Sequence, residues 1–265
     1  MFQDQRVVIT GGSSGAGKAL ARALLLRGAR VALLARDPAK LDRARSELPD
    51  PARVIAVPCD VSDAESVTRA FSAVRAALGP ATLLVNSAGI LAEGRFESTP
   101  PEVYRRLFEV NFFGTLHASR AALAHFVEAD GGRIVNIASV AGLMGVYGYA
   151  PYCSTKHALV GLSETMRVEL APTGVRVHLV CPPEFESPMV DELETYRSRE
   201  NRAMVRSLGV LSVTEVAEQI LHGIEKDRFL IVPGRNARVA TTLARWFPDL
   251  SRRMVDRMLE RARRA

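Results

Sequence analysis

The chain has 265 residues, of which 48% are hydrophobic and 24% are charged, a balance typical of a folded enzyme rather than a disordered or fibrous protein. Its three cysteines, Cys59, Cys153 and Cys181, stand at unrelated spacings, which predicts neither a disulfide framework nor a metal site and favours a reducing compartment. Met1 leads directly into a polar strand start, and no apolar run approaches the roughly 20 residues that span a bilayer. We therefore expect a cytoplasmic protein.

The net charge of +6 is concentrated at the C-terminal end. Residues 235–265 contain nine arginines and no lysine against three acidic residues, whereas residues 1–234 carry no net charge. The basic character therefore belongs to a tail. We predict a single folded domain over residues 1–234 and a basic amphipathic tail over residues 235–265.

Strand-like apolar runs alternate with helix-like stretches along most of the chain, which is typical of a parallel sheet with crossover helices. The near-continuous apolar character of these runs predicts strands that are buried on both faces. We predict one doubly wound α/β domain of the Rossmann type, with about seven parallel strands and helices on both faces of the sheet. The expected strands are 7–10, 31–34, 54–57, 83–86, 134–138, 175–180 and 229–232.

Several helix starts can be read from short motifs. Ser62 with Glu65, and Ser212 with Glu215, have the spacing of capping boxes. Pro101 suits the first position of a helix, where its missing N–H costs nothing.

The first predicted strand runs into a glycine-rich turn and then into a helix. Glycines let a backbone approach a pyrophosphate closely, and the N-terminus of the helix supplies free N–H groups. The spacing G-x-x-x-G-x-G differs from the commonest dinucleotide fingerprint, so a tight turn without a ligand is the alternative. The residues assigned here to the cofactor are Gly11, Ser13, Ser14, Gly15, Ala16 and Gly17.

The residues after the second strand indicate which dinucleotide is bound. An acidic residue at the end of that strand would bind the adenosine ribose of NAD, but Ala35 occupies the place and Arg36 follows it. Arg36 can pair with a 2′-phosphate, which favours NADP(H) over NAD(H). The alternative is a solvated Arg36 with Asp37 as the ribose partner.

Polar and small residues also follow the third and fourth strands. In open α/β sheets, ligands bind beyond the carboxyl ends of the strands. We therefore assign to the cofactor Asp60, Val61, Asn86, Ala88 and Gly89, although Asp60 is equally suited to capping a helix.

Tyr152 and Lys156 stand four residues apart and so share one helix face, one turn apart. A phenol loses its proton near a pKa of roughly 10, and a fixed ammonium beside it favours the phenolate, which makes the proton easier to exchange. This pair alone is a weak signal. With Asn111 and Ser139 preceding it in the chain, it predicts a redox active site.

These motifs, in this order from residue 7 to residue 188, resemble those of the short-chain dehydrogenase/reductase family. The resemblance implies that Tyr152 exchanges a proton with the substrate oxygen and that Ser139 hydrogen-bonds the same oxygen. It also implies that Lys156 lowers the pKa of Tyr152 and, with Tyr152, contacts the nicotinamide ribose. Asn111 would hold a water behind Lys156.

Residues 182–209 are polar and charged and begin with two prolines, which is typical of a mobile flap over a site. The family usually has Pro-Gly here, followed by a threonine near the nicotinamide. This chain has Pro183 in place of the glycine, which removes an N–H and fixes φ. The resemblance assigns Pro182 and Ser187 to the cofactor, with the Ser187 hydroxyl replacing that of the threonine.

Within the family, Pro182-Pro183-Glu184 and the stretch 142–149 resemble 3-ketodihydrosphingosine reductases, which reduce a long-chain keto-amine with NADPH. Such a substrate requires an apolar pocket with one polar end. We expect an NADPH-dependent carbonyl reductase; the alternatives are a secondary alcohol dehydrogenase for a sterol-like or small substrate and a non-catalytic, cofactor-sensing protein. The candidate pocket residues are Leu143, Met144, Val146, Tyr147, Phe185 and Met189.

The tail carries apolar residues at helical spacing, with arginines between them. That pattern is typical of a segment on an anionic membrane surface, and the preferred alternative is a helix packed on its own fold or on a neighbouring subunit. Pro248 breaks any single continuous helix here. Nucleic-acid binding is not expected, and the family resemblance implies a homodimer or homotetramer.

Overall fold

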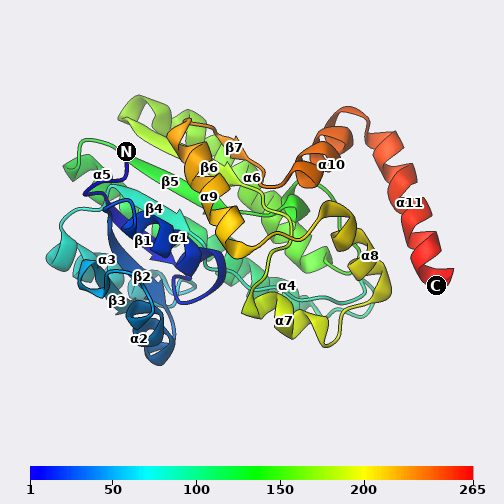
Figure 1. Cartoon of the computed structure of the whole chain (residues 1–265), viewed down its shortest axis with the longest axis horizontal. Helices are drawn as coiled ribbons and strands as arrows, with labels where there is room; N and C mark the ends of the chain where they lie inside the picture. Colours follow the sequence, from blue (N-terminus) through cyan, green and yellow to red (C-terminus); the bar gives the residue numbers. More distant parts are fainter. Residues whose placement is uncertain (265) are drawn as a thin grey trace.

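The computed structural model describes residues 1–264 and contains one seven-stranded sheet in the order β3-β2-β1-β4-β5-β6-β7 (Figure 1). Every neighbouring pair is parallel. The predicted α/β fold with about seven parallel strands is therefore confirmed. The strands are β1 (Arg6–Thr10), β2 (Arg30–Ala35), β3 (Val54–Pro58), β4 (Leu83–Asn86), β5 (Gly132–Ile137), β6 (Val175–Val180) and β7 (Leu230–Ile231).

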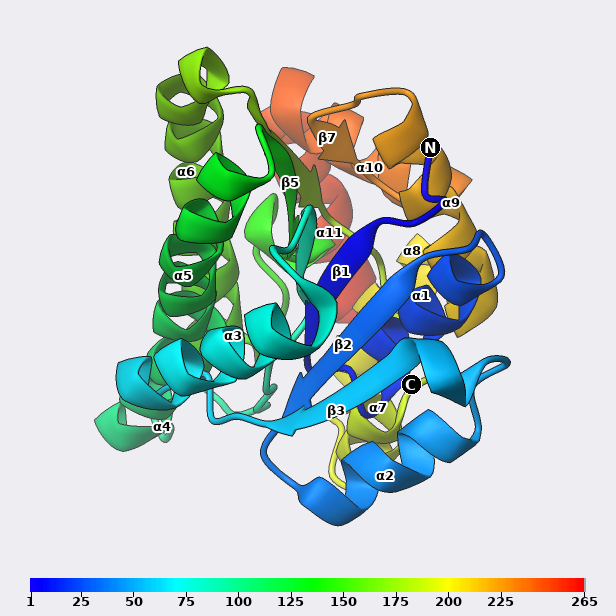
Figure 2. The same cartoon turned by 90° about the vertical axis from the view of Figure 1, so that its left-hand side faces the viewer.

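Helices cover both faces of this sheet, as Figure 2 shows. One layer contains α1 (Gly15–Leu25), α2 (Pro38–Ser46) and α9 (Val213–Glu225), and the opposite layer contains α3 (Ala64–Leu78), α5 (Gly114–Glu128) and α6 (Ala150–Leu170). The remaining helices are α4 (Pro101–Phe108), α7 (Pro188–Glu194), α8 (Arg199–Leu208), α10 (Arg235–Trp246) and α11 (Pro248–Arg264).

Alternation along the strands explains why both layers are needed. In β1, Val7 and Ile9 pack into the core shared with α1 and α9, whereas Val8 packs into the core shared with α3 and α5. Successive side chains of a strand point to opposite faces, so a strand that is apolar at every position must be covered twice. All three of these residues are fully buried.

Two of the three predicted helix starts are confirmed. The Ser212–Glu215 capping box caps α9, and Pro101 is the first residue of α4. The predicted Ser62–Glu65 box is wrong, because Asp63 caps α3 by accepting a hydrogen bond from the Glu65 N–H at 2.9 Å. Ser62 stands one residue before the N-cap, and its hydroxyl donates to Asp60 at 2.7 Å.

The segment predicted as a flap, 182–209, contains α7 and α8, so much of it is helical rather than loop. Pro248 separates α10 from α11, as predicted from its effect on a helix. The inner face of α11 packs on α8, where Val255 and Met258 meet the cluster that contains Met204. Within residues 1–264, no helix combines the length and apolar character needed to cross a bilayer.

Candidate active site

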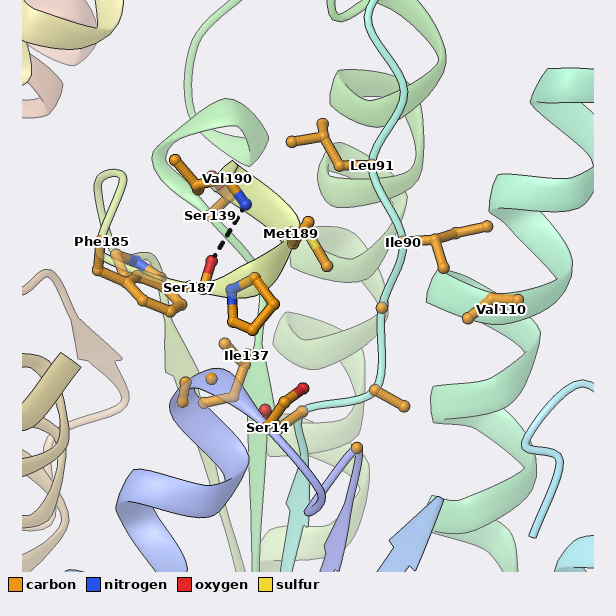
Figure 3. A pocket seen from close by; sticks show the side chains of 18 of the residues that line it. Ser14, Ile90, Leu91, Val110, Ile137, Ser139, Phe185, Ser187, Met189 and Val190 are labelled. Atoms are coloured by element: carbon orange, nitrogen blue, oxygen red, sulfur yellow. Dashed lines mark hydrogen bonds between the residues drawn. The ribbon is translucent and has the colours of Figure 1, made fainter. Parts of the chain in front are cut away.

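A cleft of about 350 Å³ opens at the carboxyl ends of the central strands (Figure 3). It lies where the strand order reverses: β1 has β2 on one side and β4 on the other, and the chain leaves these strands toward opposite helix layers. Ligands of doubly wound sheets bind at this switch point. Its walls come from the glycine turn, the ends of β2 to β5, α6, α8 and the segment 182–190.

One wall is the glycine turn that links β1 to α1. Gly11 has a φ of 66°, and a Cβ at this position would lie 2.7 Å from the Ala88 Cα, so only glycine fits here. Gly17 was predicted to contact the cofactor, but it does not line the cleft. A Cβ on Gly17 would lie 2.5 Å from the Gly11 carbonyl oxygen. Gly17 therefore lets the helix pack under the turn, and Gly11, Ser13, Ser14, Gly15 and Ala16 face the cleft.

The first turn of α1 points its free N–H groups toward the cleft. Ser14 is the N-cap residue, and among residues 1–264 no side chain caps this helix start. The first N–H groups of a helix need an acceptor, and a phosphate is well suited to supply one. The open cap and the space kept clear by Gly11 fit a dinucleotide pyrophosphate.

Thr10 holds the glycine turn against the loop after β4. Its hydroxyl oxygen accepts hydrogen bonds from the Ser87 N–H at 3.1 Å and the Ala88 N–H at 3.2 Å. This places Ala88 and Gly89, which were predicted to contact the cofactor, in the wall of the cleft. Thr10 directly precedes the glycine turn in the sequence, but it was not among the residues assigned to the cofactor.

Asn86 was predicted to contact the cofactor, but its side chain is directed into the interior. Its Nδ2 donates to Asn136 Oδ1 at 2.9 Å and to Ser119 Oγ at 3.0 Å, and Asn136 donates in turn to Ser163 at 2.9 Å. Asn86 and Asn136 are register partners in β4 and β5. These bonds hold the Asn86 Nδ2 group in the interior, so Asn86 connects strands and helices rather than lining the cleft.

Arg36, Asp60 and Val61 line the far end of the cleft, at the ends of β2 and β3. Burial acts to raise the Asp60 pKa, but hydrogen bonds from Ser62 and the charges of Arg36 and Arg106 outweigh it and hold the pKa below its ordinary value. Asp60 is therefore a carboxylate at neutral pH. It does not cap α3, which was its alternative role.

Asp37, the alternative ribose partner, also lines the cleft. Its carboxylate caps α2 by accepting the Lys40 N–H at 3.1 Å. Lys40 lies in the same part of the cleft wall. Two cationic side chains, Arg36 and Lys40, therefore flank this end of the cleft, an arrangement that suits an extra phosphate.

Tyr152, Lys156 and Ser139 meet at the other end of the cleft. One turn of α6 separates the first two, and Lys156 Nζ lies 5.5 Å from the centre of the Tyr152 ring. Nζ donates to the Ile137 carbonyl at 2.9 Å. Ser139 follows β5 and lines the cleft together with Tyr152, and its Oγ accepts the Ala141 N–H at 3.1 Å.

Burial controls the protonation of this group. It raises the pKa of Tyr152 above its ordinary value, opposed by the hydrogen bond with Ser139, and it lowers the pKa of Lys156 to about 8. Burial outweighs the hydrogen bond with Ser139, so the pKa of Tyr152 is raised in this structure, whereas the family resemblance implied that Lys156 lowers it. Tyr152 is a phenol at neutral pH and has a proton to donate.

Asn111 lies behind this group and does not line the cleft. It is fully buried in a π-helical turn, Glu109–Phe113, between α4 and α5. Its Nδ2 donates to the Ile90 carbonyl at 3.0 Å and to Thr155 Oγ1 at 3.1 Å, while its Oδ1 accepts the Ile90 N–H at 2.8 Å. Asn111 thus connects α6 to the loop after β4, and π-helical turns often occur at functional sites.

The flap forms the second wall. Phe185, Ser187 and Met189 line the cleft, as Figure 3 shows, and Pro182 contributes at its base. Ser187 caps α7: its Oγ accepts the Val190 N–H at 3.4 Å.

Three predicted substrate residues lie outside the cleft. Leu143 packs with Leu159, Met144 lines a separate groove, and Tyr147 packs in the cluster below α8. Val146, which follows the short helical turn Val140–Gly142, lines the cleft as expected of a pocket residue. The cleft is also lined by residues that were not predicted: Ile90, Leu91, Val110, Tyr149, Glu184, Val205 and Leu208.

A buried ion pair holds the flap wall in place. Arg197, 7% exposed, donates to Glu184 Oε1 at 2.8 Å and to Glu194 Oε1 at 2.6 Å. It also donates to the Tyr149 hydroxyl at 3.3 Å, and the Tyr149 ring packs edge-on against Tyr152, with centroids 5.7 Å apart. Glu194 stands only three residues from Arg197, but Glu184 and Tyr149 stand 13 and 48 residues away, so local spacing did not identify Arg197 as part of this wall.

The doubly wound sheet, with an uncapped helix start and a cleft at its switch point, is the architecture of a dinucleotide-binding protein. A tyrosine and a lysine that face this cleft from one helix point to a nucleotide-dependent oxidoreductase. Residues 5–198 match the family described as short chain dehydrogenase. The chain belongs to the short-chain dehydrogenase/reductase family and is an NAD(P)-dependent oxidoreductase.

Its relatives differ in substrate and cofactor. The 3-ketodihydrosphingosine reductase of Bos taurus is 34% identical over 229 residues, which cover 84% of this chain and 69% of that protein. The 15-hydroxyprostaglandin dehydrogenase of Rattus norvegicus, whose name specifies NAD(+), is 30% identical over 83% of this chain and 86% of its own length. A solved short chain dehydrogenase from Burkholderia cenocepacia, in complex with NADP, has a TM-score of 0.81 at 28% identity and covers 96% of this chain and 98% of its own.

Proposed function

We propose that this protein uses NADPH to reduce the ketone of a lipophilic substrate, with a long-chain keto-amine of the 3-ketodihydrosphingosine type as the leading candidate. The observation that carries the proposal is one cleft whose ends differ in chemistry. Arg36 and Lys40 flank one end, and Ser139, Tyr152 and Lys156 meet at the other, next to apolar flap residues. The relative from Bos taurus supports this choice of substrate.

The preference for NADPH depends on Arg36. The end of β2 holds Ala35 where an acidic residue would favour NAD. Arg36 and Lys40 offer two positive charges to a 2′-phosphate. The pyrophosphate would lie on the open start of α1, and the nicotinamide end near Tyr152, Lys156, Pro182 and Ser187. When bound, the dinucleotide supplies the hydride.

The chain's own residues manage the proton. Tyr152, protonated at neutral pH, would donate to the ketone oxygen, and the Ser139 hydroxyl would hydrogen-bond that oxygen as negative charge develops on it. Lys156, held by the Ile137 carbonyl, would keep a positive charge beside the phenol. Asn111 would position the Tyr152–Lys156 turn of α6 through Thr155 rather than touch the substrate.

The test is NADPH oxidation by the purified protein with a long-chain 2-amino-3-ketone, beside short ketones and beside NADH. We expect a kcat/KM at least tenfold higher for the long-chain ketone than for a short one. Met189→Ser should raise KM for the long chain alone, because Met189 lines the apolar wall. Turnover of short ketones only would keep the reductase and reject the long-chain substrate.

A second candidate is the oxidation of a secondary alcohol, favoured by the likeness to 15-hydroxyprostaglandin dehydrogenase. The same residues would serve, with Tyr152 accepting the hydroxyl proton. Faster reduction of NAD(+) by hydroxylated lipids than oxidation of NADPH by ketones would select this alternative. The absence of both activities would favour a non-catalytic, cofactor-sensing protein.

We also propose a homodimer or homotetramer formed through α5 and α6. Both helices expose apolar side chains: Val127 is 82% exposed and Val168 is 62% exposed. Apolar side chains of this size on neighbouring helices suit a subunit contact. Sedimentation at the mass of one chain would contradict this proposal.

A further inference from the structure

The two C-terminal helices carry many of the exposed large apolar side chains of the molecule. Trp246 is 70% exposed and Phe247 is 62% exposed, and both stand at the elbow between α10 and α11. Val239, Leu250 and Met254, on the flanking helices, are 50% to 61% exposed. We call residues 235–264 the C-terminal arm; it lies at the end of the molecule opposite α2 (Figure 1).

The same arm carries the protein's excess positive charge. All nine arginines of the tail lie in it and all are exposed, whereas residues 1–234 carry no net charge. Arg253 and Arg257 stand on α11 beside Met254, and Arg245 lies 6.0 Å from the centre of the Trp246 ring. Apolar and cationic groups are thus interleaved on one surface.

An apolar groove of about 910 Å³ runs between this arm and α8. Val239, Leu243 and Met254 line it, and Arg235, Arg257 and Arg261 stand along it. Leu208 lines both this groove and the catalytic cleft. The groove beside the C-terminal arm therefore adjoins the catalytic cleft at Leu208.

We propose that the C-terminal arm seats on the surface of an anionic lipid bilayer. Trp246 and Phe247 would enter the interface between headgroups and acyl chains, and the arginines would meet the anionic headgroups. A second copy of the chain is a poorer occupant, because two arms of this charge repel each other. The inference does not depend on the reductase reaction.

The experiment is flotation of the full chain with vesicles of neutral phosphatidylcholine and with vesicles that contain one quarter phosphatidylglycerol. We expect binding at least tenfold tighter to the anionic vesicles, and a decline as salt is raised. Equal binding to the two compositions, or no binding to either, would overturn the proposal.

Matched variants separate the arm from the rest of the surface. Trp246→Ser with Phe247→Ser should weaken vesicle binding at least tenfold, whereas Phe96→Ser, 78% exposed and outside the arm, should leave it unchanged. Arg253→Gln with Arg257→Gln should weaken binding, whereas Arg69→Gln with Arg105→Gln, which removes the same charge elsewhere, should not.

Two further outcomes would assign the arm to another occupant. If Trp246→Ser converts an oligomer to single chains without affecting vesicle binding, the arm is a subunit interface. If a short DNA duplex displaces the protein from vesicles and binds at least as tightly, the arm is a nucleic-acid surface. NADPH binding by each variant, measured by fluorescence, shows whether the fold is retained, because the arm lies outside the cleft wall.

Discussion

The two walls of the cleft differ in what they are made of. The glycine-turn wall, residues 11–16 with 87–89, is built largely from backbone that Gly11, Gly17 and the Thr10 hydroxyl hold in place. The flap wall, residues 182–190 with Val205 and Leu208, is built from side chains. Its position depends on a buried ion pair between Glu184 and Arg197.

This difference separates a general function from a particular one. Backbone N–H groups at a helix start suit any dinucleotide, whereas in the proposed function the side chains of the flap wall would determine which substrate fits. Between the walls lie Ser139, Tyr152 and Lys156, which would serve hydride transfer in either direction. Changes to the glycine-turn wall should therefore affect affinity for the cofactor, and changes to the flap wall should affect the choice of substrate. Changes to the three residues between the walls should affect turnover.

The largest effect should come from the residues between the walls. Tyr152→Phe removes the proton donor and should lower kcat by about 10²–10⁴-fold, with NADPH affinity changed by less than about threefold. Stopped-flow turnover with fluorescence titration of NADPH measures both. Tyr149→Phe is the matched control, since Tyr149 contacts Arg197 rather than Ser139, and its kcat should fall less than about tenfold. A Tyr152→Phe variant with kcat near wild type would refute the assigned role.

Breaking the flap-wall ion pair should have the next largest effect. Arg197→Met leaves the Glu184 carboxylate buried without its partner, which should lower the free energy of unfolding by about 3 kcal/mol and raise KM for the substrate. Urea titration measures the first quantity. Arg202→Met, which removes a more exposed partner of Glu194, should cost less than about 1 kcal/mol. Equal losses in the two variants would mean that Arg197 does not hold the flap wall.

On the glycine-turn side, Arg36→Ala should weaken NADPH binding by about tenfold, or ~1.4 kcal/mol, because a charge-assisted bond to the 2′-phosphate is lost. NADH binding should not change. Arg43→Ala, on the exposed part of α2, is the control. If both cofactors weaken equally, Arg36 acts on the common part of the dinucleotide and the preference for NADPH lies elsewhere.

The smallest expected effect is a pH dependence. Burial lowers the pKa of Lys156 to about 8, so the free enzyme loses this charge above that pH, and kcat/KM should fall along a basic limb with a midpoint near pH 8. The unfolded chain holds the proton up to a pKa of about 10.4, so it binds more protons than the folded chain between pH 8 and 10. Across that window the stability of the fold should rise while activity falls.

Lys156→Arg, which stays charged, should remove the basic limb, and Cys181→Ala should keep it, because burial raises the pKa of the Cys181 thiol to about 12. A basic limb that persists in Lys156→Arg would assign the titration to another group.

Much of the fold could be predicted from short sequence patterns. Apolar runs located the seven strands to within two residues at each end, and the glycine turn, Ser139, Tyr152 and Lys156 were found from motifs and short spacing. Each of these features depends on neighbours within a few residues, and the preferences of backbone and helix act over that range. Their placement in one cleft followed from the rule that parallel strands share a carboxyl edge.

Tertiary structure alone decided which side chains turn toward the cleft. Asn86 follows the strand-end rule, yet its amide bonds to Asn136, 50 residues away. Met144 was expected at the substrate and lies instead in the groove beside the arm, while Arg197 reaches Glu184 across 13 residues and Tyr149 across 48. Buried polar groups must be satisfied and apolar groups must be packed by whatever the fold brings near, and a sequence pattern does not encode those distant neighbours.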